Sequence, residues 1–241
     1  VFPTGSAQTG WFVEQFSVQR KFFTIANAKA IDHSWKEILK WRELGLTSHT
    51  EHAVLMASLI ESMDRVANTA GTYYAYLKTF GRKAIKPFCF RLLPPVAGPR
   101  GYVHHADALE VVRGGSFDVL YLDPPYNERD YGAYYHLPET LANGKETEVA
   151  GLCGKAISEQ PKSRFTRPGM AFQAIEELVK AARFKTLLFH YADDGIVPRD
   201  QLTNLLGSIG KLRTIQLNAI GYRTTSGCRH YQHRLYVITN A

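Results

Sequence analysis

Residues 118–136 read Asp-Val-Leu-Tyr-Leu-Asp-Pro-Pro-Tyr-Asn-Glu-Arg-Asp-Tyr-Gly-Ala-Tyr-Tyr-His. The first five predict a short apolar strand of a parallel sheet that is covered on both faces. Pro124 and Pro125 cannot continue a hydrogen-bond ladder, so we expect the strand to stop at Asp123. Because open α/β sheets bind their ligands at the carboxyl ends of the strands, the sequence predicts a binding crevice at this point.

The four residues Asp123, Pro124, Pro125 and Tyr126 form the candidate catalytic group. An exocyclic amine on a planar base is a poor nucleophile, since its lone pair is delocalised into the ring. Acceptors beside both N–H bonds stabilise the positive charge that develops on the nitrogen during attack. The Asp123 carboxylate and the Pro124 carbonyl can be those acceptors, while the Tyr126 ring offers a face for stacking. This chemistry needs no metal. The alternative is a strand end followed by a rigid turn and a core tyrosine.

The run from Asp123 to Thr140 resembles the catalytic segment of the S-adenosylmethionine-dependent DNA adenine-N6 methyltransferases of the restriction-modification type. Residues 57–78 resemble a segment that precedes it in the same family. The resemblance implies an α/β fold with a Rossmann-like sheet, mostly parallel and closed by a C-terminal antiparallel hairpin. It also implies S-adenosylmethionine as cofactor, DNA as substrate and a cognate restriction endonuclease as partner.

The same resemblance assigns roles to individual residues. Asp107 and Asp123 are expected to contact the cofactor, with Asp107 holding its adenine, a role compatible with capping a helix. The continuation of the motif and a Lys-Ser-Arg-Phe piece in the polar stretch 143–169 supply the expected substrate contacts. These are Asn127, Arg129, Tyr131, Tyr135, Lys162 and Arg164. The stretch 143–169 is expected to be a structureless loop that contacts DNA or encloses the flipped base.

Composition supports a polyanionic partner. The formal net charge is +7 and the pI is about 9.3, which favours nucleic acid, although many basic proteins owe their charge to solubility alone. The three cysteines and nine histidines show no zinc or disulfide spacing, so we expect no metal site and a reducing cytoplasmic location. The longest apolar runs are too short for a membrane span.

We divide the chain at residue 101. Residues 1–101 are expected to be a helical region with a basic and aromatic segment at 65–91 that suits DNA recognition, and to end in a Pro- and Gly-rich linker. Within it, residues 1–24 are expected to be irregular with one short strand. A helix is expected over 26–44, ended by Gly45, and a second helix from the capping-box pattern that begins at Ser48. Residues 102–241 are expected to form the catalytic core as one structural unit. This core is predicted to contain strands at 102–105, 118–122, 184–191, 213–220 and 234–239, and helices that begin at 106, 137, 170 and 197.

No glycine-rich turn of the type that receives a nucleotide cofactor follows an apolar strand in this sequence. In the resembling family that turn precedes the region matched here. We therefore expect an incomplete N-terminus that lacks the first two βα units, and weak binding of S-adenosylmethionine by the 241-residue chain alone.

The leading hypothesis is a site-specific DNA methyltransferase that modifies the N6 amine of a flipped adenine. Methylation of a guanine N2 amine in RNA or of a glutamine amide in a protein is the enzymatic alternative, and an inactive nucleic-acid-binding fragment is the non-enzymatic one. The DNA sequence recognised is not encoded in any single residue type.

Overall fold

The computed structural model describes residues 10–94, 96–99, 101–129, 131–157, 162–219, 223–224, 227–228 and 231–240. The chain divides into two compact units. Unit 1 comprises Val1–Gly98 and Tyr131–Glu159, and unit 2 comprises Pro99–Asp130 and Gln160–Ala241. The boundary between Gly98 and Pro99 lies close to the predicted division at residue 101. Residues Tyr131–Glu159, which follow the Asp123–Tyr126 segment, belong to unit 1 and not to the predicted catalytic core.

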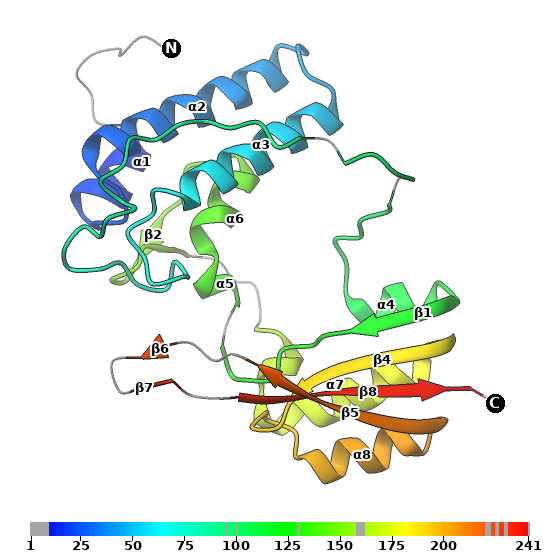
Figure 1. Cartoon of the computed structure of the whole chain (residues 1–241). Coiled ribbons are helices and arrows are strands. Elements are labelled where there is room, and N and C mark those ends of the chain that lie inside the picture. Colours follow the sequence, from blue (N-terminus) through cyan, green and yellow to red (C-terminus); the bar gives the residue numbers. More distant parts are fainter. Residues whose placement is uncertain are drawn as a thin grey trace. The chain divides into compact units, whose positions relative to one another are not determined.

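Unit 1 is mainly helical (Figure 1). Its elements are α1 (Trp11–Val13), the π-helix η1 (Glu14–Val18), α2 (Ile25–Glu43), α3 (His49–Asp64), α5 (Tyr131–Tyr134), α6 (His136–Asn143) and the antiparallel pair β2 (Val149–Ala150) and β3 (Lys155–Ala156). Large aromatic and aliphatic side chains from α1, η1, α2, α3 and α6 form one buried core.

The two long helices of unit 1 confirm the sequence prediction. The α2 helix places Ile31, Trp35 and Ile38 in the core, and Gly45 follows it in the left-handed conformation with φ 69°. The α3 helix begins with a complete capping box, in which Ser48 and Glu51 exchange side-chain and backbone hydrogen bonds. Local sequence signals therefore fixed both ends of this hairpin correctly.

The N-terminal helical segment departs from the irregular structure with a short strand that the sequence suggested for residues 1–24. Within the described part of that range, residues 11–18 are helical, and Phe12 and Phe16 are fully buried. These two rings are four residues apart and so share one helical face, which decides the conformation through burial.

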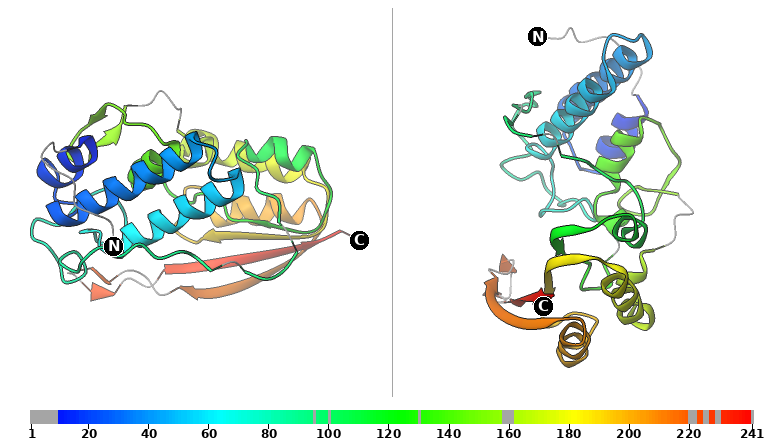
Figure 2. Two further views of the ribbon diagram at one scale, coloured as in Figure 1. Left: turned by 90° about the horizontal axis from the view of Figure 1, so that it is seen from above. Right: turned by 90° about the vertical axis from the view of Figure 1, so that its right-hand side faces the viewer.

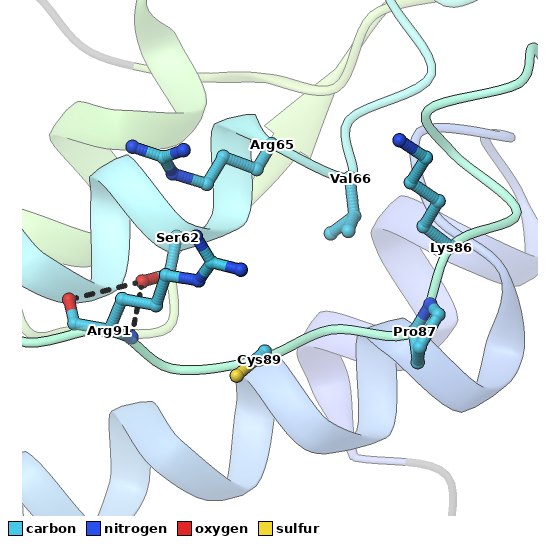
Figure 3. Close-up of a pocket in the computed structure, with 7 residues that line it drawn as sticks. All are labelled: Ser62, Arg65, Val66, Lys86, Pro87, Cys89 and Arg91. Carbon is cyan, nitrogen blue, oxygen red and sulfur yellow. Dashed lines mark hydrogen bonds between the residues drawn. The ribbon is translucent and has the colours of Figure 1, made fainter.

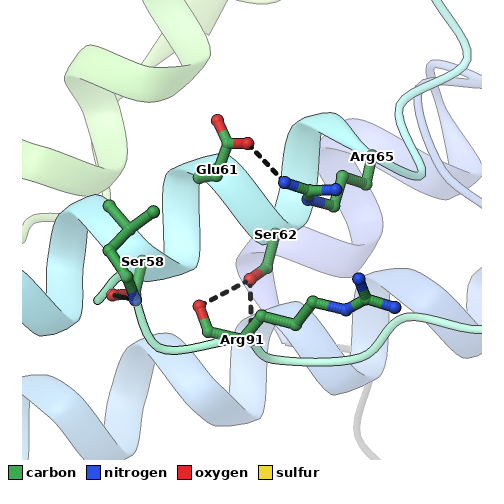
Figure 4. Close-up of polar contacts among 6 residues, drawn as sticks. Ser58, Glu61, Ser62, Arg65 and Arg91 are labelled. Atoms are coloured by element: carbon green, nitrogen blue, oxygen red, sulfur yellow. Dashed lines mark hydrogen bonds and ion pairs between the residues drawn. The ribbon is translucent and has the colours of Figure 1, made fainter.

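An extended segment after α3 is held by side chains from α2 and α3. The Asn27 amide donates to the carbonyls of Ala84 and Lys86, at 3.1 and 2.9 Å, and accepts from the Phe88 amide at 2.9 Å. Further along, Ser62 Oγ accepts from the Arg91 amide at 2.9 Å, and Ser58 Oγ accepts from the Leu93 amide at 3.0 Å. Figure 4 shows the two serines side by side on α3 with the segment passing along them. Helix side chains thus supply the hydrogen bonds that a neighbouring strand would otherwise provide.

Unit 2 is a mixed sheet with helices. Its elements are α4 (Ala108–Arg113), β1 (Phe117–Leu122), the 3₁₀-helix η2 (Arg164–Thr166), α7 (Pro168–Ala181), β4 (Phe184–Ala192), α8 (Arg199–Gly207), β5 (Lys211–Ala219), β6 (Arg223–Thr224), β7 (Gly227–Cys228) and β8 (Tyr231–Thr239). The strand order is β1-β4-β8-β5 (Figure 1). The β1–β4 pairing is parallel and both pairings of β8 are antiparallel, so β1, β4 and β5 share one direction. The C-terminal antiparallel hairpin is confirmed, and Figure 2 shows the strong curvature of β5 within it.

The prediction that β1 is covered on both faces is wrong. Leu120 and Leu122 are buried in a core with residues of α4, α7 and α8, whereas Val119 and Tyr121 on the other face are 60% and 55% exposed. The strand is apolar on both faces, but among the described residues the helices of unit 2 pack on only one of them.

Two further expectations need correction. Residues 102–105 form no strand, and Tyr102 and Val103 are 92% and 97% exposed, because no described strand pairs with them. The stretch 143–169 is not structureless, since it contains the β2–β3 pair, η2 and the start of α7; residues 158–161 lie outside the described part.

Replacing Asn27 by Ala should destabilise unit 1. The substitution leaves two carbonyls and one amide without their partner, and a buried polar group left unsatisfied costs about 1–3 kcal/mol. We expect urea unfolding followed by tryptophan fluorescence to give a free energy lower by about 3 kcal/mol. The control is Asn143→Ala at the exposed end of α6, which should stay within about 0.5 kcal/mol of wild type. An equal effect of the two substitutions would contradict this role of Asn27.

Candidate active site

Asp123 lies at the carboxyl end of β1, directly after its last paired residue. The strand stops there as predicted. Asp123 is exposed, and the next residue, Pro124, is buried. The side chain of Asp123 is 51% exposed and its Oδ1 lies 3.1 Å from Nδ1 of His190 on β4. One carboxylate oxygen is therefore held by the neighbouring strand.

A second histidine continues this contact. Nδ1 of His233 on β8 lies 3.0 Å from Nε2 of His190, and the two ring centroids are 4.9 Å apart. Burial, and then the neighbouring His190, lower the pKa of His233, against smaller opposing effects of Asp194, Asp123 and Asp193. The neutral form of His233 is thereby favoured at neutral pH.

Tyr126 is half-buried beside these rings. Its ring meets Tyr191 at 6.2 Å and His233 at 5.3 Å between centroids, both edge to face. The Tyr126 carbonyl accepts from the Ile196 amide at 2.9 Å. The ring is held by residues of β4 and β8, and the backbone by the turn that follows β4.

A bidentate ion pair fixes the turn that follows β4. Arg234 on β8 donates to both carboxylate oxygens of Asp193, at 2.6 and 2.8 Å, and the Asp193 amide donates to Gln232 O at 2.9 Å. Because this turn also carries Ile196, the pair supports the backbone of Tyr126.

The other predicted site residues of unit 2 have local contacts. Asp107 caps α4 by accepting from the Leu109 amide at 2.8 Å. Asn127 Oδ1 accepts from the Arg129 amide at 3.1 Å, which shapes the turn after Tyr126. The sixth predicted substrate contact, Arg164, donates two hydrogen bonds to Glu177 of α7, at 2.8 and 3.0 Å. Lys162 is exposed.

The remaining predicted contacts, Tyr131 and Tyr135, belong to unit 1. Their rings stack at 6.1 Å with an interplanar angle of 15°, and the side chains are 50% and 43% exposed. His136, which follows them, is buried and hydrogen-bonded through Nε2 to Tyr73 O at 2.9 Å, and burial lowers its pKa. It is a core residue of unit 1.

Unit 1 also carries a cationic hollow of about 390 Å³. Figure 3 shows the side chains of Arg65, Lys86 and Arg91 around it, with Ser62, Val66, Pro87 and Cys89 completing the lining. Arg65 forms a 2.7 Å ion pair with Glu61. Within the described part of the chain, no ion pair neutralises Lys86 or Arg91.

Two classes of feature are missing from the described residues. They contain no group of three or more histidine, cysteine or acidic side chains placed to hold a metal ion. No helix among them has the length and apolar character needed to cross a membrane.

Comparison with known proteins decides the family. The profile of the D12 class N6 adenine-specific DNA methyltransferases matches residues 12–193. The chain belongs to this family. The match includes the strand end at Asp123 and ends at residue 193, before α8, β5 and β8. No solved structure was found to match the chain.

Three curated relatives of the family are named as type II methyltransferases. M.NlaIII of Neisseria lactamica is 32% identical over 82% of this chain and 59% of its own length. M.FokI of Planomicrobium okeanokoites is 31% identical over 85% of this chain and 32% of its own length. M.CviAII of Paramecium bursaria Chlorella virus 1 is 31% identical over 83% of this chain and 59% of its own length. The chain thus spans between a third and three fifths of these relatives.

Sequence reasoning singled out Asp123 but missed the two histidines beside it. His190 lies inside an apolar strand and His233 near the start of another, 43 residues away. A single polar residue in an apolar strand was the available signal, whereas the contact depends on which strands pair.

Proposed function

We propose that this chain transfers a methyl group from S-adenosylmethionine to the N6 amine of a flipped adenine at a specific DNA sequence. The observation that carries the proposal is the strand end at Asp123, with one carboxylate oxygen held by His190 and the Tyr126 ring against His233, which contacts His190. Membership of the family supports the same reaction. The names of the relatives support a role in restriction-modification beside a cognate endonuclease.

In this proposal the protein polarises the amine and positions the base. Oδ2 of Asp123 and the Pro124 carbonyl accept the two N–H groups, and the charge that develops on the nitrogen is stabilised by these acceptors. Tyr126 stacks on the base, which has left the duplex. The other residues assigned to contacts with the DNA are Asn127, Arg129, Lys162 and Arg164 of unit 2 and Tyr131 and Tyr135 of unit 1.

The residues present fit the adenine end of the cofactor. Asp107 is exposed, and only its Oδ1 is used by the helix cap, so its other oxygen can accept from an amino group. S-adenosylmethionine supplies an electrophilic methyl group on a sulfonium sulfur. Because the sequence has no glycine-rich turn after an apolar strand, we expect the 241-residue chain to bind this cofactor weakly.

The sheet supports a Rossmann-like arrangement. Three strands share one direction, and β8 runs against them between β4 and β5. We assign catalysis to residues 102–241 and DNA recognition to residues 1–101, where the cationic hollow offers Lys86 and Arg91 to backbone phosphates.

Methyl transfer to three substrates tests the proposal. The chain would be incubated with isotopically labelled cofactor at millimolar concentration, to compensate for weak binding, and with duplex DNA, ribosomal RNA or protein. We expect N6-methyladenine in the DNA, identified by mass spectrometry, and no label in the others. Label in RNA guanine or protein glutamine would support the alternative enzymes, and no label in any substrate would overturn the activity.

Asp123→Ala should abolish methyl transfer and leave DNA binding within about twofold of wild type. Losing one acceptor of transition-state charge costs about 100-fold or more in rate. Single-turnover rates at saturating DNA check this, with Asp118→Ala on the same strand as the control, since that carboxylate is 83% exposed and paired with Lys185. A rate above a third of wild type for Asp123→Ala would rule out the assigned role.

Substitutions of Tyr126 should separate the ring from the hydroxyl. Stacking is worth about 1–3 kcal/mol per base, so Tyr126→Ala should weaken capture of the flipped base by about tenfold or more, while Tyr126→Phe stays close to wild type. The fluorescence of 2-aminopurine at the target position reports capture without methyl transfer. Equal losses for Ala and Phe would show that the hydroxyl, not the ring, is used.

Neutralising the cationic hollow should weaken DNA binding in a salt-dependent way. For the double substitution Lys86→Gln and Arg91→Gln, we expect the slope of log affinity against log salt to fall by about 0.9 per lost phosphate contact. Fluorescence anisotropy at several salt concentrations measures this slope. The charge-matched control is the double substitution Lys29→Gln and Lys40→Gln on α2. An identical change of slope in both double variants would show that the hollow does not contact the DNA.

A further inference from the structure

A row of three polar side chains crosses the sheet of unit 2, and the strand register explains it. Asp123 and His190 directly follow a paired position of the parallel strands β1 and β4, so they lie beside each other. On β8, His233 is two residues from Leu235, the partner of His190, and therefore on the same face. The pleat of three adjacent strands brings one carboxylate and two imidazoles into contact.

The chemistry of these groups fixes the direction of their hydrogen bonds. An ionised carboxylate can only accept, so Nδ1 of His190 must carry the proton it donates to Asp123. When His190 is neutral, its Nε2 is unprotonated and accepts. The proton of the second bond is then on Nδ1 of His233. This form is a one-way chain in which His233 donates to His190 and His190 donates to Asp123.

We propose that His190 and His233 are positioning residues for the methyl transfer, holding the Asp123 carboxylate in the orientation that presents Oδ2 to the target amine. The inference rests on the proposed function. It goes beyond the family motif, because neither histidine belongs to the run from Asp123 to Thr140.

The contact between His190 and Asp123 matters because the Asp123 side chain is exposed. With half of its side chain open to solvent, the carboxylate is free to turn and to exchange its partners with water unless another group fixes it. His190 is 20% exposed and is anchored in the middle of the sheet by strands on both sides. A contact from a rigid strand preorganises the acceptor before the substrate arrives.

His233 connects the acceptor with the stacking ring. Besides donating to His190, it meets the Tyr126 ring edge to face at 5.3 Å. One imidazole thus supports the group that accepts from the amine and the group that stacks on the base. Both supports come from β8, which lies between β4 and β5 in the sheet.

A first test reads the hydrogen-bond direction without any activity. In the 241-residue chain labelled with ¹⁵N-histidine, NMR distinguishes the protonated from the unprotonated ring nitrogen. We expect His190 to be protonated at Nδ1, and this preference to weaken in Asp123→Ala but not in Asp118→Ala. An unprotonated Nδ1, or no response to Asp123→Ala, would overturn the inference even if the enzyme is active.

A second test separates positioning from folding and binding. His190→Phe keeps the ring volume but removes both hydrogen bonds, and His190→Asn keeps a donor near the place of Nδ1. A hydrogen bond to a charged group is typically worth about tenfold or more, so we expect the single-turnover rate to fall at least tenfold in the Phe variant and to recover partly in the Asn variant. DNA affinity and 2-aminopurine fluorescence should remain at the wild-type level for both.

Thr186→Val, on the same face of β4, is the matched control and should keep the wild-type rate. His233→Phe should show a smaller loss than His190→Phe. If wild type transfers methyl groups and His190→Phe does so equally fast, the positioning role is wrong while the proposed function stands. If wild type transfers none, the proposed function fails. The NMR experiment then still tests whether His190 donates from Nδ1 to the Asp123 carboxylate.

Discussion

The parallel pairing of β1 with β4 is the constraint on which the site depends. It joins residues more than sixty positions apart and places the end of β1 beside the middle of β4. A shift of this register by one residue would turn every side chain of β1 to the opposite face and separate Asp123 from His190. Burial of Leu120 and Leu122 in the core of unit 2 opposes that shift, since the alternative would turn both leucines to solvent and place Val119 and Tyr121 against the core. The hydrophobic core therefore determines the geometry of the polar site.

Local sequence signals predicted much of this fold. The capping box at Ser48, the glycine after α2, the proline pair after β1 and the C-terminal hairpin each follow from a few neighbouring residues. Features that depend on distant partners were predicted less well. Val103 and its neighbours have strand-like side chains but no described strand beside them, and a strand exists only where its backbone is paired.

The candidate site divides in the same way. Asp123 and Tyr126 could be found from the sequence, because a carboxylate, two prolines and a ring in succession have a chemical meaning that needs no tertiary context. His190 and His233 could not, because their role arises only when three strands lie side by side. Arg164 illustrates the converse. The family resemblance assigned it a contact with DNA, which stays a prediction, and the fold adds a bidentate partner in Glu177 that no sequence distance predicts.

The extended segment along α2 and α3 has an evolutionary consequence. The side chains that hold its backbone, Asn27, Ser58 and Ser62, lie outside the segment itself. Its backbone hydrogen bonds are therefore supplied by the helices, while Phe88 and Phe90 pack against the core and exposed side chains of the segment remain available for variation. Lys86 and Arg91 can change in charge or size over generations while the backbone that carries them keeps its course. A scaffold of this kind allows the surface that meets a partner to diverge faster than the fold beneath it.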